Sequence, residues 1–147
     1  MSIQATGKEA LRAFASIAYL INDTTSSDIG ISVIEGDTYL EYIPAAKLDL
    51  GRKPGDKISD KTVGYRCMME RRRIVEEITK EKSAYGKAYI ANALPIFDDN
   101  NKVVGCIVTT ETNDVQEFFR DKSSILRESS NEVAQAIQNL AMQAENL

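Results

Sequence analysis

The densest pattern of apolar positions in this chain lies between Gly86 and Glu111. Two apolar runs, Ala88–Phe97 and Val103–Thr110, are rich in β-branched and aromatic residues and flank a polar tip at 98–102. Residues of the kind found in this tip tolerate tight turns, so the pattern predicts a two-stranded antiparallel hairpin. Both faces of the first run are largely apolar, which predicts that other elements cover both faces of the hairpin.

The segment from Asn113 to Leu147 contains no glycine or proline, and its apolar residues recur every seven positions. Such a repeat predicts a long helix that pairs with a second helix in a coiled coil. We expect this helix to leave the domain, to join two copies of the chain as a homodimer, and to act on downstream signalling helices. A single helix packed along its own domain is the alternative. The residues expected in the dimer seam are Phe119, Leu126, Val133, Ile137 and Leu140.

The first third of the chain shows one helical and two alternating patterns. Thr6 begins a capping box, and the apolar spacing that follows predicts an amphipathic helix from Gly7 to about Ile21. Alternation predicts strands over 29–33 and Thr38–Ile43, joined by a tight turn.

The middle of the chain is less regular. Residues 45–58 contain two glycines and a proline and form a loop near the length at which loops are usually functional. Ser59 is the expected cap of a helix from Asp60 to about Arg71, and a short strand is predicted over Ile74–Ile78.

Together these elements predict an α+β domain over residues 1–112, followed by a long exit helix over 113–147 that leads toward an output module. The domain would hold a five-stranded antiparallel sheet whose first and last hairpins lie side by side. We expect the terminal helices to cover one face of the sheet. The central loop and helix would cover the other face and leave a pocket between them and the sheet.

Composition narrows the possible functions. The chain has no histidine, which removes the commonest general base and metal ligand, and it has no zinc spacing, P-loop, dinucleotide fingerprint or GxSxG elbow. We therefore expect no metal, no cofactor and no enzymatic activity. The two cysteines, Cys67 and Cys106, are expected to be small buried residues in a reducing compartment. No apolar run is long enough for a bilayer span, so we expect a cytoplasmic protein.

The net charge of −4 conceals a basic middle segment. Residues 51–90 hold 11 basic and 6 acidic side chains, a balance of +5, between two acidic flanks. The basic groups are spread out and have few aromatic neighbours, which is not typical of a nucleic-acid interface. This distribution favours a small anionic ligand.

Three stretches resemble bacterial sensory domains of the PAS/Cache type: Gly36–Asp56, Gly64–Val75 and Ala84–Ile107. In particular they resemble the cytosolic single-Cache-like sensors that precede the signalling helices of methyl-accepting chemotaxis proteins. The resemblance implies a small-molecule sensory domain of a chemotaxis receptor or a similar transducer. No methyl-accepting hairpin is present in this chain.

The predicted pocket would draw its polar lining from the second strand, the central helix and the fourth strand. Arg66 is the residue expected to bind an anion, because a guanidinium matches carboxylate geometry. Two alternatives stay open: a GAF-type ligand-binding domain, and a dimerisation module that binds no ligand. The candidate ligand-binding residues are Tyr39, Tyr42, Tyr65, Arg66, Tyr89 and Asn92.

Overall fold

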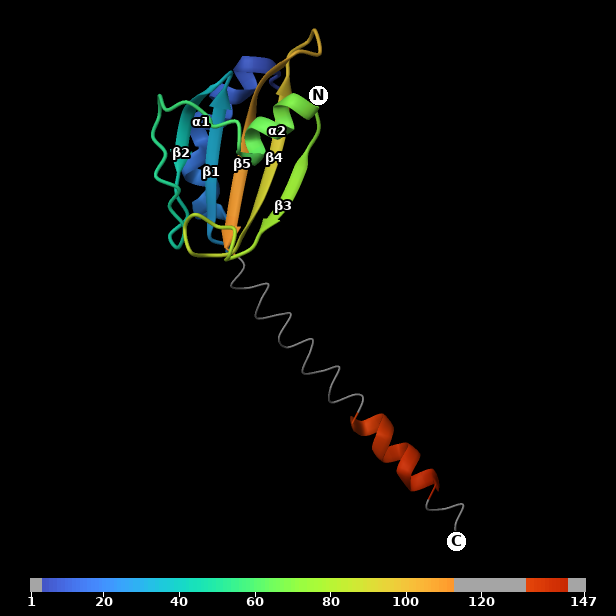
Figure 1. The fold of residues 1–147 in the computed structure, drawn as a ribbon. Helices are drawn as coiled ribbons and strands as arrows, with labels where there is room; N and C mark the ends of the chain where they lie inside the picture. Colours follow the sequence, from blue (N-terminus) through green and yellow to red (C-terminus); the bar gives the residue numbers. More distant parts are fainter. Residues whose placement is uncertain (1–3, 113–131, 143–147) are drawn as a thin grey trace. The chain divides into compact units, whose positions relative to one another are not determined.

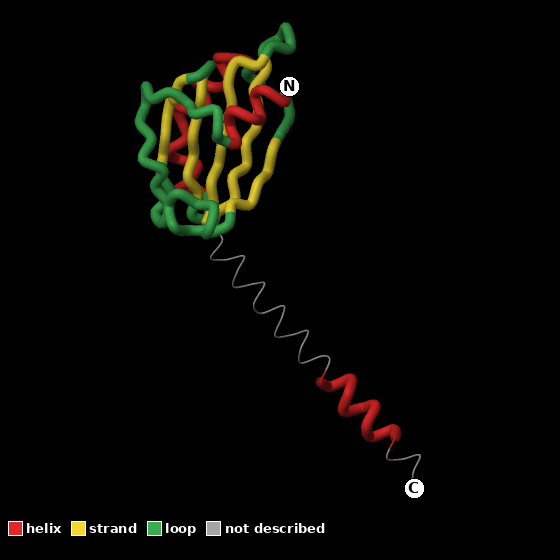
Figure 2. The backbone as a smooth tube through the Cα atoms, in the orientation of Figure 1, coloured by secondary structure: helices red, strands yellow, loops and turns green. Residues whose placement is uncertain are grey.

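The computed structural model describes residues 4–112 and 132–142 (Figures 1 and 2). The chain divides into two compact units, Met1–Thr112 and Asn113–Leu147, which are described separately below. Within the described residues, no helix has both the length and the apolar character needed to cross a membrane.

The first unit is built on one antiparallel sheet in the order β2-β1-β5-β4-β3. Because β1 pairs with β5, the first and last hairpins lie side by side, which confirms the expected α+β architecture. The strands are β1 (Ile29–Glu35), β2 (Thr38–Ile43), β3 (Ile74–Ile78), β4 (Tyr89–Phe97) and β5 (Val103–Thr112).

Helix α1 (Gly7–Thr24) packs against one face of the sheet, chiefly on β1 and β5. Leu11 and Ala18 on its inner side are fully buried. Thr6 occupies the N-cap position, but its hydroxyl makes no capping bond and instead donates to Asp99 Oδ1 at 2.9 Å. Thr6 is thus the N-cap residue as predicted, but the capping hydrogen bond of the predicted box is absent because the Thr6 hydroxyl bonds to the 98–102 tip instead.

The β1–β2 hairpin contains a bulge that changes which residues share a face. Val33 pairs with Glu41 and Ile34 pairs with Tyr39, so Leu40 is an extra residue on β2. An extra residue shifts the alternation of side chains by one position. Tyr39 and Tyr42 consequently lie on the same face of the sheet, whereas strict alternation would place them on opposite faces.

Helix α2 (Val63–Glu70) packs on the face opposite α1, mainly against β4 and β5. It begins later than predicted because Thr62, not Ser59, is its cap: the Thr62 hydroxyl accepts a hydrogen bond from the backbone of Tyr65 at 3.2 Å. The helix ends at Arg71, which adopts a left-handed conformation with φ of 59°.

The 45–58 loop runs beside β2 and is bonded to it through the backbone. The amide of Tyr39 donates to the Asp56 carbonyl and the amide of Gly55 donates to the Tyr39 carbonyl, both at 2.8 Å. At the other end, the Asp28 carboxylate accepts from the amides of Ala46 and Lys47 at 2.7 and 3.0 Å. This long loop is therefore a fixed wall of the domain.

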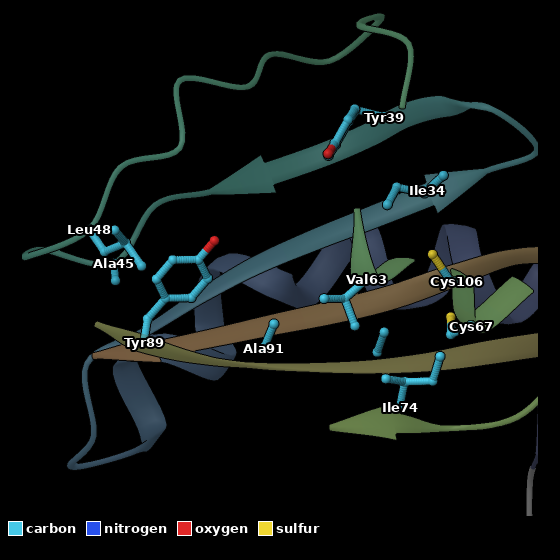
Figure 3. Packing of buried hydrophobic residues seen from close by; sticks show 11 residues of the cluster. Ile34, Tyr39, Ala45, Leu48, Val63, Cys67, Ile74, Tyr89, Ala91 and Cys106 are labelled. Atoms are coloured by element: carbon cyan, nitrogen blue, oxygen red, sulfur yellow. The ribbon is translucent and has the colours of Figure 1, made fainter. Parts of the chain in front are cut away.

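The sheet separates two apolar clusters. Leu11, Ile31 and Val33 form the centre of the cluster beneath α1. A larger cluster, shown in Figure 3, lies beneath α2 and the 45–58 loop and includes Ile34, Tyr39, Tyr89 and the two cysteines. The prediction that other elements cover both faces of the β4–β5 hairpin holds only in part. On the β3–β4 side of the sheet, Val75 and Leu94 are 57% and 47% exposed.

Residues 132–142 of the second unit are helical. Three predicted seam residues, Val133, Ile137 and Leu140, lie in this helix and are all exposed. The other two, Phe119 and Leu126, lie outside the described residues, as does most of the predicted long helix. Pairing through this segment stays a prediction.

Candidate ligand pocket

A cavity of about 530 Å³ lies between the sheet, the 45–58 loop, α2 and the 79–85 turn. This is within the size range of small-molecule sites, roughly 300–1,000 Å³. Its lining residues are Ser32, Ile34, Tyr39, Leu50, Arg52, Ile58, Ser59, Lys61, Thr62, Val63, Gly64, Arg66, Glu76, Glu77, Ile78, Thr79, Lys82, Ala84, Tyr85, Tyr89, Ala91, Val108 and Thr110.

Two buried hydroxyl groups form part of the floor of the cavity. Ser32 on β1 and Thr110 on β5 are only 5% and 4% exposed, and both line the cavity. Gly30 lies opposite Thr110, and a Cβ atom at Gly30 would come within 2.6 Å of the Thr110 hydroxyl oxygen. A hydroxyl can both donate and accept, so these two groups at the cavity can form hydrogen bonds with a bound molecule.

Arg52 contributes a positive charge from the 45–58 loop. Its guanidinium carbon lies 5.9 Å from the centre of the Tyr39 ring, within cation–π range. Its Nε atom is buried and has no hydrogen-bond partner in the described part of the chain. No ion pair is formed by Arg52 within the described residues. The site therefore contains an unused donor on a permanently charged group.

Tyrosine rings form an aromatic wall around this charge. Tyr85 and Tyr89 meet edge to face with their ring centres 6.2 Å apart. Burial raises the pKa of both Tyr39 and Tyr89, and the neighbouring Arg52 charge partly opposes that rise at each residue. Because one guanidinium acts on both hydroxyls, Arg52 lies within electrostatic reach of Tyr39 and Tyr89. Figure 3 shows both tyrosines in the buried cluster that also contains Val63 of α2.

The second arginine of the cavity is already paired. Arg66 on α2 forms a close ion pair with Glu76 on β3, and both side chains remain partly exposed. The pair joins the helix to the edge strand across the cavity wall. Its two charges compensate each other, so Arg66 is a weaker attraction for an anion than Arg52.

The structure brings three of the six predicted ligand residues to the cavity: Tyr39, Arg66 and Tyr89. Tyr42 shares a face with Tyr39, but its hydroxyl accepts from the Leu50 amide at 2.6 Å and donates to Asp49 at 3.2 Å, so it supports the loop. Tyr65 does not line the cavity.

Asn92 also lies away from the cavity. It is three positions from Tyr89 on β4, so strand alternation turns the two side chains to opposite faces. Its side-chain carbonyl accepts from Arg73 Nε at 3.0 Å instead. Whether any of the six residues contacts a ligand stays a prediction.

Sequence reasoning missed Arg52, Ser32, Thr110 and Tyr85. Signals for two of them were present: Ser32 interrupts an otherwise apolar strand, and Arg52 lies in the loop whose length already indicated function. Neither signal identifies a pocket without the strand register. Thr110 and Tyr85 carry no comparable mark in the sequence.

The two cysteines lie beside the cavity wall and are both fully buried, as predicted. The Cys67 thiol donates to the Gly64 carbonyl at 3.1 Å, and the two thiols also interact with each other. That interaction and burial raise the pKa of Cys106. Within the described residues no group of three or more potential metal ligands is present.

No family model matches the chain. It is 28% identical over 97 residues to a Bacillus subtilis (strain 168) protein named "Putative sensory transducer protein YfmS". The match covers 66% of this chain and 33% of that protein, so the chain matches about a third of the relative's length.

Proposed function

We propose that this chain is the signal-input domain of a bacterial signal transducer of the chemotaxis-receptor kind, which binds a small molecule in the cavity beneath α2. The observation that carries the proposal is a cavity of about 530 Å³ that is lined by the Ser32 and Thr110 hydroxyls and by Arg52, whose buried Nε atom has no partner in the described residues. The similarity to a protein named as a sensory transducer supports the same reading.

The cavity counts against a module that only dimerises, because such a module would gain stability by filling its core. A binding role without catalysis is proposed, since the sequence contains no histidine and no recognisable catalytic motif. We also propose a cytoplasmic location, because the sequence contains no long apolar run.

Signal transmission would use strand β5. Val108 and Thr110 line the cavity, and the strand ends two residues later at Thr112, directly before the 113–147 segment. A bound molecule that favours one position of β5 would bias the arrangement of the exit helix that the sequence predicts over residues 113–147. Such a shift can be no larger than the difference in ligand affinity between the two arrangements.

Native mass spectrometry of the purified chain tests the proposal, supported by thermal melting in a screen of small metabolites. We expect to find a co-purified small molecule bound to the chain, or a metabolite that binds in the cavity and raises the melting temperature of the chain. A filling substitution at the floor, Ala91→Phe, should abolish the effect while the chain stays folded. No bound mass together with no stabilising metabolite would contradict the sensory role.

A further inference from the structure

We infer that the cavity takes an organic acid, with its carboxylate on Arg52 and its apolar body against the wall formed by Tyr39, Tyr85 and Tyr89. This inference rests on the proposed sensory function and specifies the chemical class of the ligand.

Arg52 has a side-chain donor that the described part of the chain leaves unused. Its guanidinium is held over the Tyr39 ring, its Nε atom is buried, and the described chain offers it no carboxylate. A buried donor left unsatisfied costs free energy, and the cost is greatest for a charged group. A planar carboxylate accepts two parallel bonds from a guanidinium, so it satisfies this group better than a neutral acceptor does.

The other charged residues of the cavity are paired or exposed. The Arg66 charge is compensated by Glu76, so it does not compete for an incoming anion. Lys61 and Lys82 also line the cavity, but their side chains are exposed, where charges are hydrated and screened. Glu77 also lines the cavity and is likewise exposed. Among the charged lining residues, Arg52 has a buried side-chain nitrogen without a hydrogen-bond partner in the described residues, so it is the strongest attraction for an anion.

Much of the cavity lining is apolar. Beside the tyrosines, the cavity is bounded by aliphatic side chains from three strands, the loop and α2, including Ile34, Leu50, Ile58, Val63 and Val108. An inorganic anion would leave this surface unused. The two floor hydroxyls of Ser32 and Thr110 can donate or accept, so they suit a second polar group on the ligand.

Calorimetric titration with matched probes tests the inference. The probes are benzoate, phenylacetate, hexanoate and indole-3-acetate, each compared with its neutral primary amide. We expect at least one acid to bind about 10- to 100-fold more tightly than its amide, the range for one charge-assisted interaction. The comparison between acid and amide is made on the wild-type chain, so it does not depend on a variant that folds.

Variants then assign the charge. Arg52→Met keeps the apolar stem and should abolish the preference for acid over amide, and Arg52→Lys should retain only part of it. Lys53→Met is the matched control, because it removes a neighbouring charge that does not line the cavity. It should bind the acids as the wild type does.

The inference fails if acids and amides bind equally, or if Arg52→Met keeps the preference for acids. In either case the cavity still binds small molecules and the sensory function stands. It also fails if no acid binds, and the co-purification experiment then decides separately whether the sensory function fails as well.

Discussion

The Tyr42 hydroxyl joins β2 to the loop that closes the cavity. It accepts a hydrogen bond from the Leu50 amide and donates one to Asp49. Leu50 lines the cavity, so this tyrosine shapes the site without entering it. Burial raises the pKa of Tyr42 to about 12, from an ordinary value of 10.0.

This shift predicts a loss of stability in alkali. The pKa of Tyr42 is higher in the folded state than in the unfolded state. The stability that this difference contributes to the folded state is therefore complete below pH 10 and is lost as the pH rises from about 10 to about 12. Thermal melting between pH 8 and pH 12 should show the fall, and Tyr42→Phe should reduce its size. Tyr19→Phe is the control, since Tyr19 is 60% exposed. Equal pH dependence in Tyr42→Phe and wild type would refute this role.

At neutral pH, Tyr42→Phe should destabilise the domain by about 1 kcal/mol, because the Leu50 amide loses its hydrogen-bond acceptor. Urea unfolding monitored by circular dichroism measures this difference. A variant as stable as the wild type would mean that water replaces the hydroxyl at no cost.

Gly105 sets a second constraint at the scale of one residue. A Cβ atom there would overlap the Ile34 carbonyl oxygen and would lie 2.6 Å from Leu11 Cδ1. Gly105→Ala should therefore destabilise the domain by about 3 kcal/mol or more, since a backbone atom of the neighbouring strand β1 must move. Gly64→Ala should cost less, because the closest atom there is a Val108 methyl carbon at 3.0 Å. Urea unfolding of both variants gives the comparison, and equal losses would contradict it.

At the scale of elements, the start of α2 controls the helix that covers the cavity. Thr62 caps the helix through its hydroxyl, whereas the hydroxyl of Ser59 accepts from the Lys61 amide in the turn before it. Thr62→Ala should lower stability by about 1 kcal/mol, the usual cost of losing a cap. Ser59→Ala should cost less. The order would be reversed if the cap that the sequence predicts were the true one, and chemical unfolding of both variants decides.

Most of the elements could be predicted from the sequence, because each strand and helix carries a periodic pattern of its own. The hairpin at β4–β5 and the short strand β3 lie where the apolar runs place them. The capping choices could not be predicted, since Ser59 and Thr62 both have the required hydroxyl and only tertiary packing selects one.

The site was less predictable than the fold because it depends on which residues share a face. The extra residue at Leu40 brings Tyr39 and Tyr42 to one face, and nothing in the local sequence marks the bulge. The prediction of Asn92 was wrong for a different reason. Asn92 lies three positions from Tyr89 on β4, so simple alternation already places the two side chains on opposite faces and excludes a shared pocket. Arg52 was overlooked because a loop residue acquires its neighbours only from the fold.

At the scale of the whole molecule, the 113–147 segment is expected to join two copies of the chain. Val133, Ile137 and Leu140 are exposed in the described helix and are spaced four and three residues apart, as in a coiled-coil seam. Light scattering across a micromolar dilution series should show a dimer, and Leu140→Asp should shift it to monomer. Gln138→Asp adds the same charge to the same helix outside the seam and should leave the dimer intact. A wild type that is monomeric at every concentration would contradict the model of paired exit helices.

The bonding of the 45–58 loop along β2 also bears on solubility. A sheet edge with free amides and carbonyls invites pairing with another chain, which is a route to aggregation. The loop occupies part of the β2 edge through its bonds to Tyr39, which leaves β3 as the more open edge of the described sheet. That strand is five residues long and carries Glu76 and Glu77, both features that discourage strand addition. The loop that forms one wall of the cavity therefore also protects the domain from assembling edge to edge.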